Sequence, residues 1–247
     1  VAFNAQDDEG NWDPSPDERI IWVGEVVYVD QSAPGPTHDG ASWDTAFLTI
    51  QEGVDAAAAV SGPVWAADGT YIENVVMAED VRIFGGFLGA EPGGYETELE
   101  QRDFASNVTT IDGNQSGSCV TMAAGARVDG FTVTNGSGTE DGSDTYGGGF
   151  YCADQCDSAA IENNTIVANS AVREAGSARG GGIYCSGPSL TMANNTISDN
   201  NAEVLYPGES YGGGVYCSGS FAAITGNTIC GNTAWVDFDH GAGYGGG

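Results

Sequence analysis

Short segments of the chain alternate apolar and polar residues with a period of two, and the same segments recur at a nearly fixed distance. The phrase GGG[FIV]YC begins at Gly147, Gly180 and Gly212, and a fourth GGG begins at Gly245. A period of two places neighbouring side chains on opposite faces of a β-strand. In each copy the apolar residue and the Cys therefore share one face, and the Tyr between them lies on the other.

A second phrase keeps the same distance. NNTIVAN begins at Asn163, NNTISDN at Asn194 and GNTICGN at Gly226. Two phrases that share one period, here about 32 residues, indicate a solenoid of stacked repeats. Helical repeats would need apolar residues about every 3.6 positions, whereas these repeats alternate and are rich in Gly, Asn, Thr and Ser. The sequence predicts an all-β fold, a parallel β-solenoid with about three short strands in each coil and Asn or Gly at the corners.

Equivalent residues of stacked coils lie about 4.8 Å apart, so they form ladders. Asn169, Asn200 and Asn232 are equivalent, and we expect their amides to hydrogen-bond from coil to coil at one corner. Asn tolerates the left-handed backbone of a sharp bend, so we expect that conformation at these positions. Thr132 lies one repeat before Thr165, which places an upstream strand in the same register.

The cysteines of the GGG[FIV]YC phrases form a further ladder. We expect Cys152, Cys185 and Cys217 to point inward and to be buried as small apolar residues. Three stacked residues cannot all pair, and parallel stacking strains a disulfide. We expect at most one disulfide, and it would involve one of three other residues: Cys156, Cys119 or Cys230.

The two phrases together resemble a known repeat. GGG[FIV] followed by IxxN is similar to the GGA[ILV] and FxxN repeats of polymorphic outer membrane proteins. Over residues 128–247 the coils resemble the right-handed parallel β-helix of the pectate-lyase-like superfamily. The resemblance implies a single-stranded, right-handed parallel β-helix. The IxxN pairs are Ile166 with Asn169, Ile197 with Asn200, and Ile229 with Asn232.

Upstream, the chain predicts shorter coils, a cap and an arm. Phe47, Ile50, Val54 and Ala57 follow one another in steps of 3, 4 and 3, which predicts a short helix over about 44–60 that covers the first coil. We expect an extended N-terminal arm followed by one β-helix domain. The boundaries are 1–25 for the arm, 26–247 for the domain, 61–135 for its short coils and 136–247 for its long coils, which carry the full repeat.

The charge of the chain excludes two classes of partner. There are 35 acidic residues against six Arg and no Lys, which gives a net charge of −29. Nucleic acids and anionic membranes would be repelled by such a surface. The carboxylates indicate a solubilising surface, and the alternative is a surface that binds calcium, because this cation prefers oxygen ligands.

Several features are compatible with an extracellular or cell-surface protein. No run of 18 apolar residues occurs, so we expect no membrane insertion. The sequence begins at Val1 rather than Met, which suggests a processed or trimmed chain. The even number of six Cys permits disulfides in a secreted protein, and five Asn-x-Ser/Thr triplets add little weight.

Six tyrosines are the candidate binding surface. Between each IxxN corner and the next GGG lies a segment that varies between coils, and variable loops on one side of a solenoid are typical of a binding face. An exposed tyrosine stripe suits sugar stacking or contact with another subunit. The alternative is that the variable loops fold back and bury it. The six residues are Tyr151, Tyr184 and Tyr216 in the strands and Tyr146, Tyr211 and Tyr244 before the glycines.

The resemblance also raises a catalytic hypothesis. A lyase of the superfamily implies a groove in which carboxylates bind calcium beside an Arg or Lys base. Arg179 beside Glu174 is the candidate base, and the alternative is that Arg173 and Arg179 pair with neighbouring acids. His38 and His240 provide little material for a catalytic triad.

One pair of carboxylates is a candidate calcium site. Asp237 and Asp239 are separated by a single residue, so both could bind one cation together with Glu203 or Glu209 of the preceding coil. Such pairs arise by chance in so acidic a chain. Calcium is therefore a secondary hypothesis.

The sequence favours a non-enzymatic, extracellular structural or adhesive β-helix. The fourth GGG stands at the end of the sequence, so either the sequence is incomplete or a neighbouring copy completes this coil. In the second case we expect an open edge that pairs with another copy, as an oligomer or filament joined end to end. Residues 1–25 are the candidate segment that completes such a contact. The alternative is a secreted protein that binds or cleaves polysaccharide.

Overall fold

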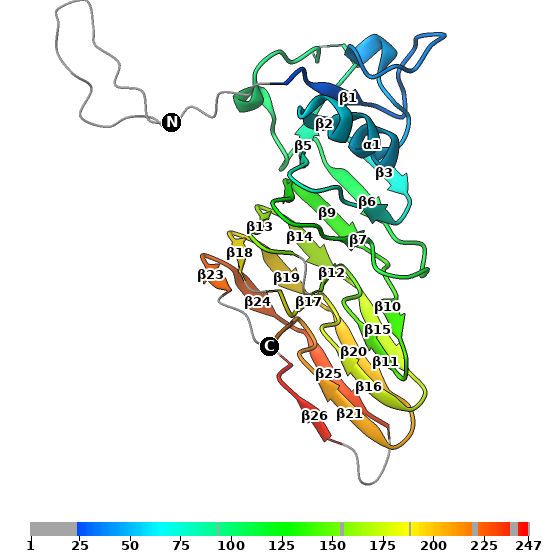
Figure 1. Cartoon of the computed structure of the whole chain (residues 1–247), viewed down its shortest axis with the longest axis vertical. Coiled ribbons are helices and arrows are strands. Elements are labelled where there is room, and N and C mark those ends of the chain that lie inside the picture. The colour runs from blue at the N-terminus through cyan, green and yellow to red at the C-terminus, as the bar shows by residue number, and fades with distance from the viewer. Residues whose placement is uncertain are drawn as a thin grey trace, which may run out of the picture.

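The computed structural model describes residues 24–92, 94–153, 156–187, 189–218, 222–237 and 242–246. The chain winds around one axis, so strands of successive coils lie side by side (Figure 1). Among the described strands, β10 and β11 pair antiparallel and the other pairs are parallel. The predicted all-β parallel β-helix is confirmed. Residues 1–23 of the predicted arm lie outside the described residues.

Three parallel sheets form the walls of the β-helix in the described part of the chain. Sheet I contains β1 (Val27–Val29), β2 (Pro63–Ala67), β5 (Arg82–Phe87), β8 (Arg127–Asp129), β13 (Ala159–Glu162), β18 (Leu190–Ala193) and β23 (Ala223–Thr225). Sheet II contains β3 (Gly69–Ile72), β6 (Thr109–Asp112), β9 (Phe131–Thr134), β14 (Thr165–Val167), β19 (Thr196–Ser198) and β24 (Thr228–Cys230). Sheet III contains β4 (Val75–Val76), β7 (Val120–Thr121), β12 (Phe150–Cys152), β17 (Ile183–Cys185) and β22 (Val215–Cys217).

Two further sheets form a lateral layer, called the lateral arm from here on and distinct from the predicted N-terminal arm. The prediction of about three strands in each coil was therefore wrong for the C-terminal coils. The variable segments are strands, which stack along the side of the β-helix (Figure 1). The first arm sheet contains β15 (Ser170–Arg173), β20 (Asn201–Val204) and β25 (Thr233–Val236). The second contains β10 (Thr139–Asp141), β11 (Asp144–Tyr146), β16 (Gly176–Arg179), β21 (Gly208–Tyr211) and β26 (Ala242–Tyr244).

Small side chains explain why the variable segments pair as sheets. Ala171, Ala178 and Ala202 are fully buried and form a small core with Val204 and Val236. Alanine lets the two arm sheets approach closely, and each strand of the arm finds a parallel partner in the next coil. The arm is therefore a second, thinner layer of the same solenoid.

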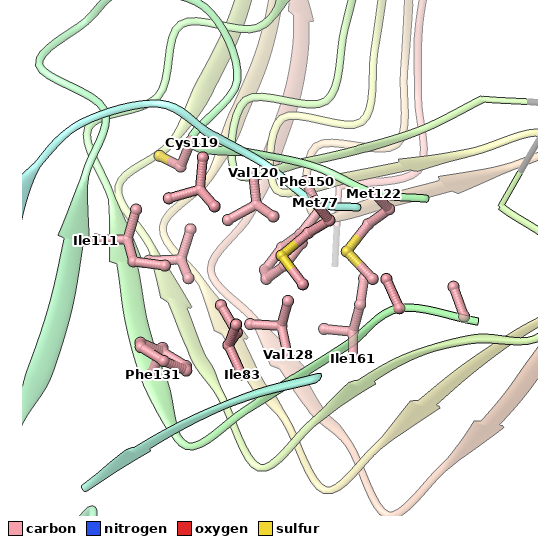
Figure 2. Close-up of a cluster of buried hydrophobic side chains, with 14 of the residues drawn as sticks. Met77, Ile83, Ile111, Cys119, Val120, Met122, Val128, Phe131, Phe150 and Ile161 are labelled. Carbon is pink, nitrogen blue, oxygen red and sulfur yellow. The ribbon is translucent and has the colours of Figure 1, made fainter. Parts of the chain in front are cut away.

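The inward faces of sheets I, II and III enclose one apolar core. Ile83 and Val128 point inward from sheet I, Ile111 from sheet II, and Val120 and Phe150 from sheet III, as Figure 2 shows. All five side chains are fully buried. Burial of each such side chain stabilises the fold by roughly 1.5–3 kcal/mol relative to exposure. The alternation seen in the sequence thus separates this core from the outer faces.

Two ladders of asparagine amides connect the coils. Asn169 Nδ2 donates to Asn200 Oδ1 at 3.0 Å, and Asn200 Nδ2 donates to Asn232 Oδ1 at 2.9 Å, which confirms the predicted ladder. The same amide of Asn200 also donates to the Ile166 carbonyl at 2.9 Å. A second ladder, which was not expected from the sequence, joins Asn164, Asn195 and Asn227 in the same way.

The left-handed backbone lies one residue before the first ladder, which corrects the expectation that Asn itself adopts it. Ala168, Asp199 and Gly231 have φ values of 56°, 55° and 67°. The bend is made by these residues, and the following Asn keeps its amide inside the corner. Ala and Asp accept this costly conformation because the amide hydrogen bonds hold the corner in place.

Helix α1 (Ile50–Val60) covers the first coil, but it is shorter than the predicted range of 44–60. Residues 43–45 form the 3₁₀ helix η1 (Trp43–Thr45), and Phe47 pairs with Val29 as an isolated bridge rather than joining the helix. Thr49 and Glu52 form a capping box, which fixes the start of α1 at Ile50.

An aromatic cluster on the outer face of sheet I was not predicted. Trp65 and Phe87 stack with ring centroids 4.7 Å apart, and Trp43 packs against Phe87 at 5.6 Å. The segment that contains the 3₁₀ helix η2 (Leu99–Gln101) adds Leu99 to this cluster. The N-terminal coils are thus packed on both faces of sheet I.

Glu73 makes the cap of α1 sensitive to pH. Its carboxylate accepts hydrogen bonds from the Ile50 and Gln51 amides at 2.7 and 3.0 Å. Burial raises the pKa of Glu73 above its ordinary value, with a further contribution from the charge of Glu52, although the two amides oppose the shift. The folded protein therefore binds a proton more tightly at Glu73 than the unfolded chain does.

We expect the Glu73 contribution to stability to fall as the pH rises from the unfolded pKa of this group through its raised folded pKa. Glu73→Gln should remove that slope, because the substituted side chain does not titrate. Urea unfolding measured across the acidic range, with Glu79→Gln as the exposed control, tests this. Equal slopes in the Glu73→Gln protein and the unchanged protein would contradict the assignment.

We expect Asn200→Ala to lower the free energy of unfolding by about 1–3 kcal/mol, because it leaves buried polar groups of two neighbouring coils without partners. Ser198→Ala, on the outer face of the same coil, should change it by less than about 0.5 kcal/mol. Chemical denaturation of both variants measures the difference. A loss in Asn200→Ala no larger than that in Ser198→Ala would show that the ladder does not hold the coils.

Candidate functional site

Three tyrosines of sheet III stack along the axis. Tyr151 pairs with Tyr184, and Tyr184 pairs with Tyr216, in parallel register. Their ring centroids are 5.7 and 5.8 Å apart, and the planes differ by 14° and 4°. The predicted ladder is confirmed, and the three rings form a nearly parallel column on the outer face.

A second column faces the first from the arm. Tyr146, Arg179, Tyr211 and Tyr244 end successive strands of the second arm sheet and pair in register. The rings of Tyr146 and Tyr184 approach to 4.6 Å between centroids, at an angle of 57°. We call the two columns together the tyrosine cluster; its members are Tyr146, Tyr151, Tyr184, Tyr211, Tyr216, Tyr244 and Arg179.

Glycine makes this close approach of the two sheets feasible. The GGG segments connect the second arm sheet to sheet III, and a Cβ atom at Gly149 would lie 2.7 Å from the Gly182 carbonyl oxygen. A Cβ at Gly182 would lie 2.6 Å from the Gly214 carbonyl oxygen. Any side chain would therefore push neighbouring coils apart, which explains why the phrase recurs.

Arg179 replaces a tyrosine in the second column and is held on several sides. Its guanidinium lies 5.6 Å from the ring centre of Tyr146 and 5.5 Å from that of Tyr211. Its Nη1 pairs with Asp144 Oδ2 at 2.5 Å. Asp144 also accepts from the Ser177 amide at 2.9 Å and from the Tyr146 hydroxyl at 3.1 Å. The guanidinium of Arg179 therefore lies between the rings of Tyr146 and Tyr211, at the position that a tyrosine has in the other coils.

These contacts change the acidity of the tyrosine cluster. Burial raises the pKa of Asp144, but the hydrogen bonds from Arg179, Ser177 and Tyr146 outweigh it, and the net pKa is lowered. Burial and the Asp144 hydrogen bond raise the pKa of Tyr146 to about 12. A 2.6 Å hydrogen bond to Glu209 raises the pKa of Tyr211 to about 12. Both tyrosines therefore stay protonated at neutral pH.

The arrangement offers edges and hydroxyl groups to solvent rather than ring faces. Tyr146, Tyr151, Tyr184, Tyr211 and Tyr216 are half-buried, whereas Tyr244 is 51% exposed. Because stacked rings cover one another's faces, a sugar cannot lie flat on an inner ring of the column. The six tyrosines are brought together as predicted, and the variable segments partly bury them.

The catalytic hypothesis placed Glu174 beside Arg179, and the structure does not pair these two side chains. Arg179 pairs with Asp144 rather than Glu174, and Arg173 Nη1 pairs with Glu140 at 3.0 Å. His38 contacts the Ala46 carbonyl through Nδ1 at 2.9 Å, and His240 lies outside the described residues. The alternative in which both arginines pair with neighbouring acids describes the structure.

The candidate calcium ligands are only partly described. Asp237 is exposed, and Asp239 lies outside the described residues. Glu203 accepts a hydrogen bond from Asn201 at 2.9 Å, and Glu209 accepts the one from Tyr211. Within the described segments, no group of three or more His, Cys, Asp or Glu side chains is placed to hold a metal ion.

The inward cysteines stack as expected. Cys152 pairs in register with Cys185, and both are fully buried. Hydrogen bonds to Cys156 and Cys185, followed by burial, raise the pKa of Cys152. Cys119, Cys156 and Cys230 are thiols, so the disulfide considered for one of them is not formed. Cys217, in the last described coil, is exposed rather than buried.

A buried ion network was missed by sequence reasoning. Asp129, on the outer face of sheet I, is fully buried, and its carboxylate contacts Arg102 Nη2 at 2.8 Å and Arg127 Nε at 3.1 Å. Arg127 also pairs with Glu162 at 2.6 Å, and Asn163 donates to Asp129 at 3.0 Å. Arg127 and Asp129 lie two positions apart in one strand, so the sequence indicated that they share a face. Arg102 comes from an irregular segment, where no periodic pattern indicates its neighbours.

The comparison with protein families agrees with this architecture. The chain matches the family described as the right-handed β-helix region over residues 90–240. No curated protein sequence matches it. None of the described helices is long and apolar enough to cross a bilayer.

Two crystal structures of the pectin methylesterase from Aspergillus niger are similar to the chain. The penultimately deglycosylated form shares 15% identity over 90% of this chain and 84% of the enzyme chain, with a TM-score of 0.33. The deglycosylated form shares 14% identity over 88% and 89%, with a TM-score of 0.31. Because the family match spans more than half of the 247 residues, this protein belongs to the family of the right-handed β-helix region.

Proposed function

We propose that this chain is a non-enzymatic structural or adhesive β-helix that works outside the cell. The observation that supports the proposal is that the repeated polar and aromatic side chains contact other residues of the same chain. The asparagine amides bind the next coil, the tyrosines stack on one another, and Asp129 is enclosed by two arginines. Residues of a catalytic site would converge on a space for substrate, whereas these residues converge on each other.

The state of Arg179 supports this proposal over a lyase. Partial burial lowers the pKa of its guanidinium, but the hydrogen bond and the charge of Asp144 outweigh this effect. The net pKa of Arg179 is therefore raised above its ordinary value. A base must be able to lose its proton near the working pH. The geometry therefore favours a structural cation at this position.

A polysaccharide-binding protein is the second candidate. The tyrosine cluster presents a row of phenol hydroxyls beside the carboxylates of Asp144 and Glu209. Such groups can accept and donate hydrogen bonds to sugar hydroxyls along a chain. This candidate needs no proton transfer, so it remains compatible with the state of Arg179.

The proposed self-association uses the last described coil. Ile224 and Ile229 pair in register with the fully buried Met192 and Ile197, yet they are 48% and 38% exposed. A further layer of β-structure on this face would bury apolar area. At the opposite end α1 covers the first coil, so two copies of a chain that presents this C-terminal face would meet through it as a closed dimer rather than as an open filament.

We expect no cleavage of uronic-acid polymers. Polygalacturonate incubated with the full chain, with and without calcium, should not gain the ultraviolet absorbance of unsaturated ends. Arg179→Ala should behave as the unchanged protein does, and Arg173→Ala, which removes the ion pair with Glu140, is the matched control. Absorbance that rises with the unchanged protein and disappears only in Arg179→Ala would overturn the non-enzymatic proposal.

For a protein of these 247 residues we expect a dimer whose affinity increases with salt, because ions screen the repulsion between two chains of charge −29. Ile229→Asp should shift it to monomer, since it places a carboxylate in the contact. Thr225→Asp adds the same charge to the outer face of that coil and should leave the dimer intact. Sedimentation velocity at low and high salt measures this; a monomer under both conditions would refute the contact.

A further inference from the structure

Six threonines stand in one unbroken row on sheet II. Adjacent members pair in parallel register across five consecutive strand pairs. Neighbouring strands lie about 4.8 Å apart, so hydroxyl and methyl groups repeat at that distance along the axis. The strands that carry the row are stacked along the length of the β-helix (Figure 1). The row consists of Thr70, Thr110, Thr132, Thr165, Thr196 and Thr228.

The row faces outward. Its strand neighbours Ile111, Val133 and Ile166 are fully buried, so alternation directs the threonines to the other side of the sheet. None of the six is buried. Within the described residues, their hydroxyls form no hydrogen bond, whereas the hydroxyls of Thr109 and Thr145 donate to the carbonyls of Ala66 and Val172. The row therefore keeps its hydrogen-bonding capacity for something outside the chain.

This face is almost free of charge in a strongly acidic protein. The outward residues two positions further along the same strands are aliphatic, hydroxyl or thiol side chains, with one carboxylate among them. A cationic partner would be drawn to surfaces that carry more carboxylates, because the chain has 35 acidic residues. A sugar would find no aromatic ring here. The second column consists of Ile72, Asp112, Thr134, Val167, Ser198 and Cys230.

The spacing of the face is held from both sides. The ladder of Asn164, Asn195 and Asn227 immediately precedes β14, β19 and β24. The ladder of Asn169 and Asn200 follows the same strands two residues after they end. Flat sheets are typically stabilised by such side-chain ladders, and these two ladders flank the three C-terminal strands of sheet II.

We propose that the outer face of sheet II binds ice. A partner for this surface must be flat, uncharged, periodic and able to hydrogen-bond, and a crystal of water meets all four conditions. Each threonine hydroxyl has one donor and two acceptor sites, so it can take the place of a water molecule in a lattice. The oxygen spacing along one axis of hexagonal ice is close to the distance between β-strands, and the methyl groups between the hydroxyls order the adjacent water. Such binding would require neither dimerisation nor contact with a polysaccharide.

Partition into slowly growing ice tests the proposal. The full chain is mixed with serum albumin, ice is grown on a cooled probe, and the protein in the ice is compared with that in the remaining liquid. Thr165→Tyr and Thr196→Tyr place bulk at the centre of the row. Thr191→Tyr, on the outer face of sheet I in a neighbouring strand, is the matched control. Thermal unfolding of each variant verifies that it is folded.

The unchanged protein and Thr191→Tyr should enter the ice, and both variants of the row should be excluded to the level of albumin. Exclusion of the unchanged protein would overturn the proposal. Equal loss in Thr191→Tyr would show that this face is not responsible. Retention on crystalline cellulose or chitin, without entry into ice, would assign the face to a polysaccharide instead and also overturn it.

Discussion

Amide hydrogen bonds that run along the axis hold the coils in register, and the rest of the structure depends on that register. Each buried amide satisfies a backbone carbonyl of one coil and the side chain of the next, so the polar groups of the corner satisfy one another. A slip of one residue would turn the core outward and break both ladders together. The stacks of Tyr, Thr and Cys follow from this constraint.

The lateral arm is held by the same coil-to-coil register, but its core contains different side chains. Alanines replace the branched residues of the main core, and the two arm sheets pack as a thin layer. Because each arm strand pairs with its equivalent in the next coil, the segments that vary in sequence still share one geometry. The tyrosine cluster forms where this layer meets sheet III, and it joins the two parts of every C-terminal coil.

Sequence periodicity was sufficient to predict features that repeat, and it failed for those that do not. Tyr184 was expected between Tyr151 and Tyr216, and the first asparagine ladder was expected at its observed residues, because both follow directly from the fixed repeat. The arm strands were missed because Ala171 and Ala178 are weak signals of alternation. The contact of Arg102 with Asp129 joins a non-repeating segment to a strand, and no local pattern indicates it.

The glycine contacts between coils limit how such a protein can change its length. Gly149 lies against the carbonyl of Gly182, and Gly182 lies against that of Gly214, so each corner fits only another corner of the same shape. An insertion of a few residues there would leave a coil without a matching neighbour. Duplication or loss of one whole coil would preserve every contact, so evolutionary variation in the size of this solenoid should proceed in steps of a complete repeat.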